Sequence, residues 1–402
     1  MDIMDDGKLA AANLPDDVVV EILSRLPVRA LHQCKLVSRA WRAVISHPDH
    51  RRRLAQPLLG FFYHLHVDAS SPPIPYWRFA AAAAAAAGVD PAVRWFQPPP
   101  GYSATDTELL DSCNGLVLLR CCRAPSSSVY VVCNPAAGDW VELPAPTHAP
   151  GAFGLRSDHL QGRRRTRLAA LAFDPAVSPS RFHVLQLVER EEYDDPFMSH
   201  YCFVVEAAEI YSSETKAWHL SVVMWNGYFK CTGHQAAYHD GSVHFAVDDG
   251  GAVVSVDVEG GAWRLTSMIP VCQVTYGGGR FLGRSRGRLL YVHKGSHASL
   301  SVYSLERQSR GADEQWELKH YASPMDQFGK TLFKEHDAVV AVHPDGDVIF
   351  LFDACRGILM AYDMGRRTVR DIQLPLAQAS RYYPFFPYVP MYSSQALSSG
   401  GN

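Results

Sequence analysis

Apolar residues between positions 14 and 54 recur at three- and four-residue spacing, the pattern of amphipathic helices. Leu14-Pro15-Asp16-Asp17 opens the first expected helix, with a proline at its start and two carboxylates near the positive end of the helix dipole. The apolar positions expected on one face are Val18, Val19, Ile22, Leu23 and Leu26, and Pro27 ends the run. A second short helix is expected over 30–36 and a third over 37–45. This segment therefore predicts a small helical head.

From about residue 58 onward, helical spacing gives way to short β-type runs separated by Gly, Asp and Pro, as in all-β architectures. A loose repeat recurs over residues 108–143, 168–220, 235–269, 280–321 and 338–374. The last strand of each copy begins near Trp140, Trp218, Trp263, Trp316 and Val369. Each copy supplies about four strands, and radial stacking of such sheets covers both faces of each, which is the β-propeller solution. The tryptophans are then expected to fill the gaps between adjacent sheets.

Apolar segments at both ends of the body remain outside the five copies. Residues 60–67 and 93–97 precede the first copy, and residues 382–392 follow the fifth. We expect these ends to pair in one mixed blade, because unpaired sheet edges favour unwanted pairing with other chains. The fold class is thus mainly β with a small N-terminal helical head, and six blades are expected, with five or seven left open.

The expected domains are a disordered tail over 1–12, a helical head over 13–54, a propeller over 55–393 and a disordered tail over 394–402. The Ser/Pro-rich stretch 70–75 and the alanine tract 80–87 are expected to form a variable loop between strands.

The head carries more apolar residues than three short helices can bury among themselves. In one interpretation the excess apolar face packs on the β body. In the other it binds a partner protein.

The spaced apolar positions of the head carry a resemblance to a known motif. The stretch 14–45 resembles an F-box along its whole length, with Val18 and Cys34 as mild departures from the residues common in that family. The resemblance implies docking onto a Skp-type adaptor, which joins the chain to a cullin-RING ubiquitin ligase. The adaptor-binding residues that it implies are Leu14, Pro15, Val18, Ile22, Leu23, Leu26, Pro27, Leu31, Val37 and Trp41.

The first β repeat carries a second resemblance. It contains Ser112-Cys113-Asn114-Gly115-Leu116, then Asn134-Pro135, Trp140 and Leu143-Pro144. In these motifs it is similar to the F-box-associated domain of plant F-box proteins, a kelch-like propeller, whereas the later repeats match by pattern alone. The resemblance implies that the propeller binds an unknown protein substrate for ubiquitination.

Arg and aromatic side chains are enriched at interface hot spots, which makes several positions of the propeller candidates for substrate contact. Arg163, Arg164 and Arg165 lie in an expected loop over 151–167, which is either simply solvated or binds an acidic or phosphorylated segment. The other candidates are Tyr193, Phe197, Trp225 and Tyr228.

Composition and charge narrow the compartment and the partners. The 402 residues include 38 Lys+Arg and 41 Asp+Glu, a net charge of −3, which argues against a nucleic-acid-binding protein. The N-terminus lacks the features of a signal peptide, and no stretch approaches the roughly 18 apolar residues that span a membrane. Nine cysteines, an odd number, fit a reducing compartment, so we expect the cytoplasm and/or nucleus.

The motif search predicts no catalytic or metal chemistry. No CxxC pair, P-loop or HExxH string is present, and His64-x-His66 lacks nearby metal-ligand partners. No cofactor is expected, and the chain is interpreted as a non-catalytic subunit of a ubiquitin ligase. Two alternatives remain: a propeller enzyme or ligand sensor that uses the central channel, and an F-box protein that acts outside a ligase.

Overall fold

The structure is a computed structural model of the whole chain, which divides into two compact units. Unit 1 comprises Met1–Pro57 with Ala176–Pro179, and unit 2 comprises Leu58–Pro175 with Ser180–Asn402. The structure describes residues 14–26, 34, 39–46, 50, 58–64, 77–81, 98–124, 127–148, 164–165, 168–195, 200–223, 231–247, 252–267, 279–295, 297–306, 315–325, 331–334, 336–372, 385–391 and 397.

Two helices are described in unit 1, α1 (Asp16–Ser24) and α3 (Arg39–Ser46). The expected second helix lies mostly outside the described residues, although Cys34 is helical. Among the described residues, no helix is long and apolar enough to cross a membrane.

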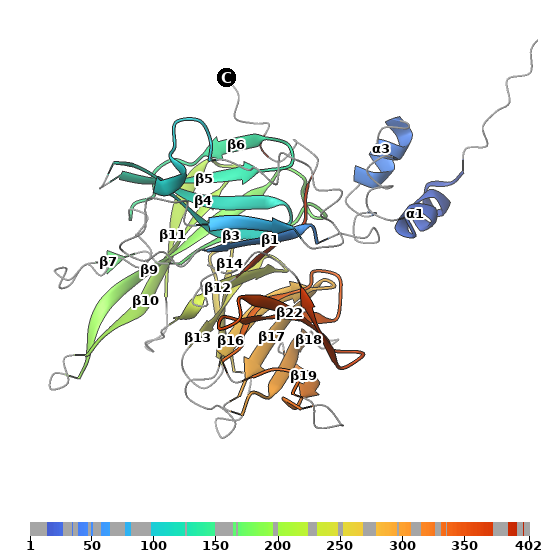
Figure 1. Cartoon of the computed structure of the whole chain (residues 1–402). Coiled ribbons are helices and arrows are strands. Elements are labelled where there is room, and N and C mark those ends of the chain that lie inside the picture. The colour runs from blue at the N-terminus through green and yellow to red at the C-terminus, as the bar shows by residue number, and fades with distance from the viewer. Residues whose placement is uncertain are drawn as a thin grey trace, which may run out of the picture. The chain divides into compact units, whose positions relative to one another are not determined.

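Unit 2 consists of antiparallel sheets that follow the predicted repeats (Figure 1). Blade 1 contains β3 (Thr107–Cys113), β4 (Leu116–Ala124), β5 (Ser127–Asn134) and β6 (Asp139–Glu142), preceded by the 3-10 helix η2 (Ala104–Asp106). Blade 2 contains β8 (Ala169–Phe173), β9 (Phe182–Asp195), β10 (His200–Ser212) and β11 (Ala217–Val222), with the two-residue strand β7 (Arg164–Arg165) also paired to β9.

The next three repeats form four-stranded blades of the same order. Blade 3 contains β12 (Cys231–His239), β13 (Ser242–Val247), β14 (Ala252–Asp257) and β15 (Trp263–Ser267). Blade 4 contains β16 (Gly279–Ser285), β17 (Arg288–Lys294), β18 (Leu300–Glu306) and β19 (Gln315–Ala322). Blade 5 contains β20 (Ala338–Val342), β21 (Val348–Asp353), β22 (Ile358–Asp363) and β23 (Thr368–Ile372).

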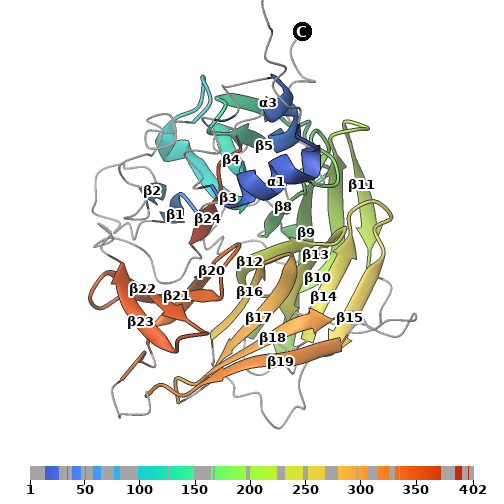
Figure 2. The same ribbon diagram turned by 90° about the vertical axis from the view of Figure 1, so that its right-hand side faces the viewer.

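The closing blade joins the two ends of the body. Its order is β2 (Trp77–Ala81), β1 (Gly60–His64) and β24 (Phe386–Tyr388), with Phe62 of β1 opposite Phe386 of β24. The innermost strands β3, β8, β12, β16, β20 and β24 contact one another in turn, and β24 contacts β3 (Figure 2). The ring therefore closes with six blades, and the predicted mixed blade is confirmed.

Strand β2 of the closing blade was not predicted. The alanine tract was expected to be a loop from residue 80 onward, but Ala80 and Ala81 belong to β2, and Ala80 is buried. Trp77 and Phe79 pack on Phe62, with ring centroids 5.7 and 4.9 Å apart, and this aromatic packing overrides the helix preference of alanine. The expected strand over 93–97 lies outside the described residues.

The outer-strand tryptophans connect neighbouring blades, as predicted. The indole N–H of Trp218 in blade 2 donates to the Pro144 carbonyl beyond blade 1 at 2.7 Å. The indole N–H of Trp263 in blade 3 donates to the hydroxyl of Ser221 in blade 2 at 2.8 Å. Trp140 departs from this prediction. It is 41% exposed and therefore does not fill a gap between blades.

The turn between β3 and β4 ties blade 1 to both of its neighbours. Asn114 and Gly115 have φ angles of 50° and 94°, the positive values that two-residue hairpin turns of type I′ require. The Asn114 amide donates to the carbonyl of Phe173 in blade 2 at 2.6 Å, and the Ser112 hydroxyl donates to that of Pro387 in the closing blade at 3.3 Å. The motif behind the second resemblance is thus a structural junction of the ring.

The C-terminal segment packs on the same junction. Met391 and Leu397 are both buried, in a cluster with apolar residues of blades 1 and 2. Leu397 falls within the tail over 394–402 that was expected to be disordered, and the rest of that tail lies outside the described residues, so this expectation stays a prediction. The expected tail over 1–12 lies outside the described residues.

Candidate functional site

The start of α1 follows from its first residues. Pro15 occupies the N-cap position with a φ of −54°, and its carbonyl accepts the N–H groups of Val18 and Val19 at 3.0 and 3.1 Å. Asp16 and Asp17 lie in the first turn, where their carboxylates interact favourably with the helix dipole. The sequence prediction of a helix start at this point is confirmed.

The apolar residues of α1 occupy two faces instead of the one expected. Residues advance about 100° around a helix, so Ile22 lies about 40° from Val18, whereas Leu23 lies about 140° from it. The buried face carries Val19, Val20 and Leu23, which pack with Val44 and Ile45 of α3. An apolar arc this wide exceeds what one partner helix can cover, and three- and four-residue spacing alone did not separate the two faces.

The second face of α1 is open. Leu14, Val18 and Ile22 are exposed by 50%, 43% and 45%. Val18 and Ile22 are four residues apart and therefore share one face of α1, and Leu14 directly precedes the N-cap residue Pro15. We call these three residues the exposed stripe. An exposed group of apolar side chains beside a packed core is typical of a protein-binding surface.

The other residues predicted to bind an adaptor divide into four groups. Leu23 is only 1% exposed, so in this conformation it supports the stripe from inside the head. Leu26 and Trp41 are half-buried against the same core, and Pro15 is exposed beside the stripe. Pro27, Leu31 and Val37 lie outside the described residues.

The residues predicted to contact a substrate all belong to blade 2 or to the segments next to its strands. Arg164 and Arg165 form β7, and Tyr193 lies on β9 opposite Tyr201 of β10. Arg163 directly precedes β7, Phe197 lies between β9 and β10, and Trp225 and Tyr228 follow β11. Arg163, Phe197, Trp225 and Tyr228 are outside the described residues.

The basic loop expected over 151–167 is wrong at Arg164 and Arg165. These two residues pair with Arg190 and Glu189 of β9, in an antiparallel register. The physical reason is the length of β9, which extends beyond β8 and leaves backbone groups at its edge that another strand can pair with.

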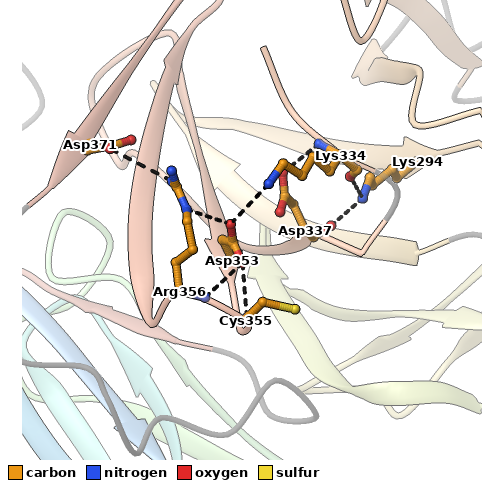
Figure 3. Close-up of polar contacts among 7 residues, drawn as sticks. All are labelled: Lys294, Lys334, Asp337, Asp353, Cys355, Arg356 and Asp371. Carbon is orange, nitrogen blue, oxygen red and sulfur yellow. Dashed lines mark hydrogen bonds and ion pairs between the residues drawn. The ribbon is translucent and has the colours of Figure 1, made fainter. Parts of the chain in front are cut away.

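A polar network connects blades 4 and 5 (Figure 3). The buried ammonium of Lys294 donates to the carbonyls of Lys334 and Asp337, the first at 2.6 Å. Buried Asp353 accepts hydrogen bonds from the Arg356 guanidinium at 2.8 Å and from the Cys355 N–H at 3.0 Å. Burial opposes ionisation of Asp353, but these hydrogen bonds outweigh it and lower the pKa of its carboxyl. The network holds Lys334 and Asp337, which precede β20, in place.

The polar groups near the inner strands are engaged by backbone. Burial raises the pKa of Cys113 to about 12, and its thiol donates to the Phe173 carbonyl at 3.3 Å, so the reactive thiolate is suppressed. Burial raises the pKa of Asp111 to about 7, and its oxygens accept the N–H groups of Ser112 and Leu171. His64 donates through Nε2 to the Leu109 carbonyl at 2.9 Å. Among the described residues, no group of three or more His, Cys, Asp or Glu has the arrangement of a metal site.

Comparison with known proteins agrees with both parts of this architecture. The F-box-like family model matches residues 11–57, and the model described as F-box protein At3g26010-like, beta-propeller, matches residues 93–380. The chain is 24% identical over 279 residues to F-box protein At5g49610 of Arabidopsis thaliana, which covers 69% of each chain. It is 28% identical over 214 residues to F-box protein At5g07610 of the same organism, which covers 50% of this chain and 44% of that protein.

The similarity to solved structures is low in both TM-score and sequence identity. A chain from a nidogen/laminin complex has a TM-score of 0.41 and 11% identity, over 83% of this chain and 99% of that one. TolB from Acinetobacter baumannii has a TM-score of 0.37 and 13% identity, over 83% of this chain and 66% of that one. Neither likeness supports an inference about function.

A helical head with an exposed apolar stripe, joined in one chain to a six-bladed ring, defines an F-box protein with a β-propeller. The propeller model matches well over half of the sequence. The chain therefore belongs to the F-box protein At3g26010-like β-propeller family.

Proposed function

We propose that this chain is the substrate-recognition subunit of a Skp–cullin–F-box ubiquitin ligase. The head binds a Skp-type adaptor and through it a cullin-RING ligase, and the propeller binds the protein to be ubiquitinated. The observation that supports this proposal best is the exposed stripe, which lies on the segment matched by the F-box-like model. The ubiquitin-transfer chemistry then takes place on other subunits, in the cytoplasm and/or nucleus.

The area left open on the stripe is large enough to matter for binding. Fully burying a Val, Leu or Ile side chain contributes about 1.5–3 kcal/mol, so completing the burial of a half-exposed one contributes about 1 kcal/mol. The three residues of the stripe together then contribute about 3 kcal/mol, which corresponds to about a hundredfold in affinity. A partner that covers α1 therefore gains substantially from these residues alone.

The proposal is tested with a stripe variant, Leu14→Ala with Ile22→Ala. Alanine retains the helix propensity of α1, so the change removes contact area and leaves the helix intact. Two half-exposed side chains at about 1 kcal/mol each predict a Kd for a purified Skp-type adaptor weakened about thirtyfold. Isothermal titration calorimetry on the full chain measures it.

A matched control removes equal apolar exposure from the propeller. Leu220→Ala with Val222→Ala truncates side chains of β11 that are 51% and 54% exposed, and the adaptor Kd should stay within twofold. An unchanged Kd in the stripe variant, or an equal loss in the control, would contradict the proposal.

Two outcomes separate the alternatives. If the adaptor binds but no cullin co-purifies with the complex, the chain acts outside a ligase. Turnover of a small molecule by the purified full chain would point instead to a propeller enzyme.

A further inference from the structure

Three buried polar groups on blade 4 have no hydrogen-bond partner among the described residues. They are the hydroxyl of Tyr291, Nε2 of His293 and the indole N–H of Trp316, on side chains that are 0%, 6% and 7% exposed. Tyr291 and Trp316 pack with small apolar residues of blade 3, among them Ala237 and Ala246, and His293 follows two residues after Tyr291 on the same face of β17. Because buried polar groups are normally paired, these three need an explanation.

Blade 3 shows that the ring does not need polar groups at these positions. Tyr291 and His293 are the fourth and sixth residues of β17, and the fourth and sixth residues of β13 are Phe245 and Val247. Phe245 and Val247 are buried in an apolar cluster with residues of blade 2. The hydroxyl and the imidazole of blade 4 are therefore additions to a packing that apolar side chains satisfy in the neighbouring blade.

The outer-strand tryptophan of blade 4 departs from its counterparts in the same way. The indole N–H groups of Trp218 and Trp263 each donate a hydrogen bond to the preceding blade or to the segment that follows it. Trp316 instead packs against the ring of Tyr291, with centroids 6.1 Å apart, and its N–H donates to no described residue. Unpaired donors thus gather where blade 4 faces blade 3.

A positive charge lies at the same interface. Arg280 of β16 is directly opposite His293 in the sheet, and its Nη1 donates to the carbonyl of Val247 in blade 3 at 3.1 Å. Burial raises the pKa of Tyr291 to about 12, so its hydroxyl stays protonated and is able to donate. Burial and the Arg280 charge lower the pKa of His293, so its imidazole is neutral at pH 7 and keeps one N–H. Donors beside a cation suit a ligand with negatively charged oxygen atoms.

The polar side chains continue to the outer edge of blade 4. The row that begins with Arg280 and His293 passes in register through Ser301 of β18 to Tyr321 of β19. Tyr321 is 55% exposed. One row of polar residues therefore crosses all four strands, from the inner strand to the surface.

We propose that the interface between blades 3 and 4 binds a small oxyanion, which enters along this row and accepts hydrogen bonds from Tyr291 and His293 beside the charge of Arg280. The N–H of Trp316, whose ring contacts Tyr291, supplies a further donor next to them. The site lies wholly within unit 2, so this inference goes beyond the proposed adaptor role and does not depend on it.

Thermal unfolding of the full chain tests the proposal. Sodium phosphate and sodium malonate, each at 10 mM, are compared with sodium chloride at the same ionic strength. An anion that binds the folded chain alone raises Tm, and we expect at least one of the two to raise it by about 2 °C or more above the chloride value. No rise with either anion would overturn the proposal and would leave the three groups hydrated only.

A double variant and a matched control locate the site. Tyr291→Phe with His293→Val installs the residues that blade 3 uses, so the anion-induced rise should disappear while Tm in chloride is unchanged or higher. The control is Tyr362→Phe, at an equally buried tyrosine whose hydroxyl pairs with His320 at 2.9 Å. It should keep the anion-induced rise although its own Tm falls. Equal rises in the unmodified chain and the double variant would show a general salt effect and refute the site.

Isothermal titration calorimetry with the more effective anion tests the hydroxyl on its own. Tyr291→Phe removes one donor to a charged acceptor and should weaken the Kd at least tenfold, whereas Tyr362→Phe should leave it within twofold. A Kd in Tyr291→Phe equal to that of the unmodified chain would exclude Tyr291 as a ligand contact and overturn the proposed site.

Discussion

Gly115→Ala tests whether the C-terminal segment locks the ring at the turn between β3 and β4. A Cβ at this position would lie 2.5 Å from Met391 Cβ, 2.7 Å from Met391 N and 2.9 Å from the Val389 carbonyl oxygen. Two of these atoms belong to the backbone, so no side-chain rotation relieves the contact. The chain leading from β24 to the junction must move instead.

The expected cost has two parts. Gly115 has a φ of +94°, a conformation that costs a non-glycine residue about 1–3 kcal/mol. Overpacking a well-filled site adds typically about 1–3 kcal/mol. We therefore expect Gly115→Ala to lower the free energy of unfolding by about 4 kcal/mol.

A matched control isolates the second part. Gly101 has nearly the same φ, +93°, but a Cβ there would meet no atom within 4 Å. Gly101→Ala therefore carries only the backbone cost, and the difference between the two variants, about 2 kcal/mol, measures the contact with the C-terminal segment. Equilibrium urea unfolding of the full chain, followed by tryptophan fluorescence, gives both values. Equal losses in the two variants would refute the lock.

Two further predictions concern the ring. His244 is buried, which lowers its pKa to about 4, below the ordinary value of 6.5, so the unfolded chain takes up the proton first as the pH falls. The free energy of unfolding therefore falls as the pH drops below about 6.5. In urea unfolding, His244→Gln should make the decrease between pH 7 and pH 5 smaller by about 2 kcal/mol. An unchanged decrease would show that His244 is not responsible. Trp263→Phe removes the hydrogen bond to Ser221 and should cost about 1 kcal/mol more than Trp140→Phe at its exposed position, whereas equal costs would mean that this bond does not stabilise the pairing of blades 2 and 3.

Local pattern was sufficient for much of this protein. Spacing of apolar residues and the proline and carboxylates at Pro15–Asp17 predicted where α1 begins, because helix starts depend on groups within one turn. The five repeats were visible because each blade buries both faces of the same four-stranded unit and therefore reuses similar residues, such as Trp218 and Trp263. The mixed closing blade also followed, because leftover β segments at both ends need partners.

The predictions that failed are those that depend on which distant residues pack against a given side chain. Leu23 and Ile22 are adjacent and similarly apolar, yet one is in the core and the other is exposed, because α3 covers only part of α1. Ala80 and Ala81 form a strand because Phe62 offers an aromatic surface to the residues just before them.

The sequence by itself determined that a helical head precedes a repeated β body, since helix and strand periodicities are written in residues close together along the chain. Only the tertiary structure decided which apolar residues of α1 stay exposed, and that Arg164 and Arg165 pair with the strand β9 that also carries Tyr193. Burial and strand pairing join residues distant in sequence, so which face stays open is fixed only once every other element has taken its place.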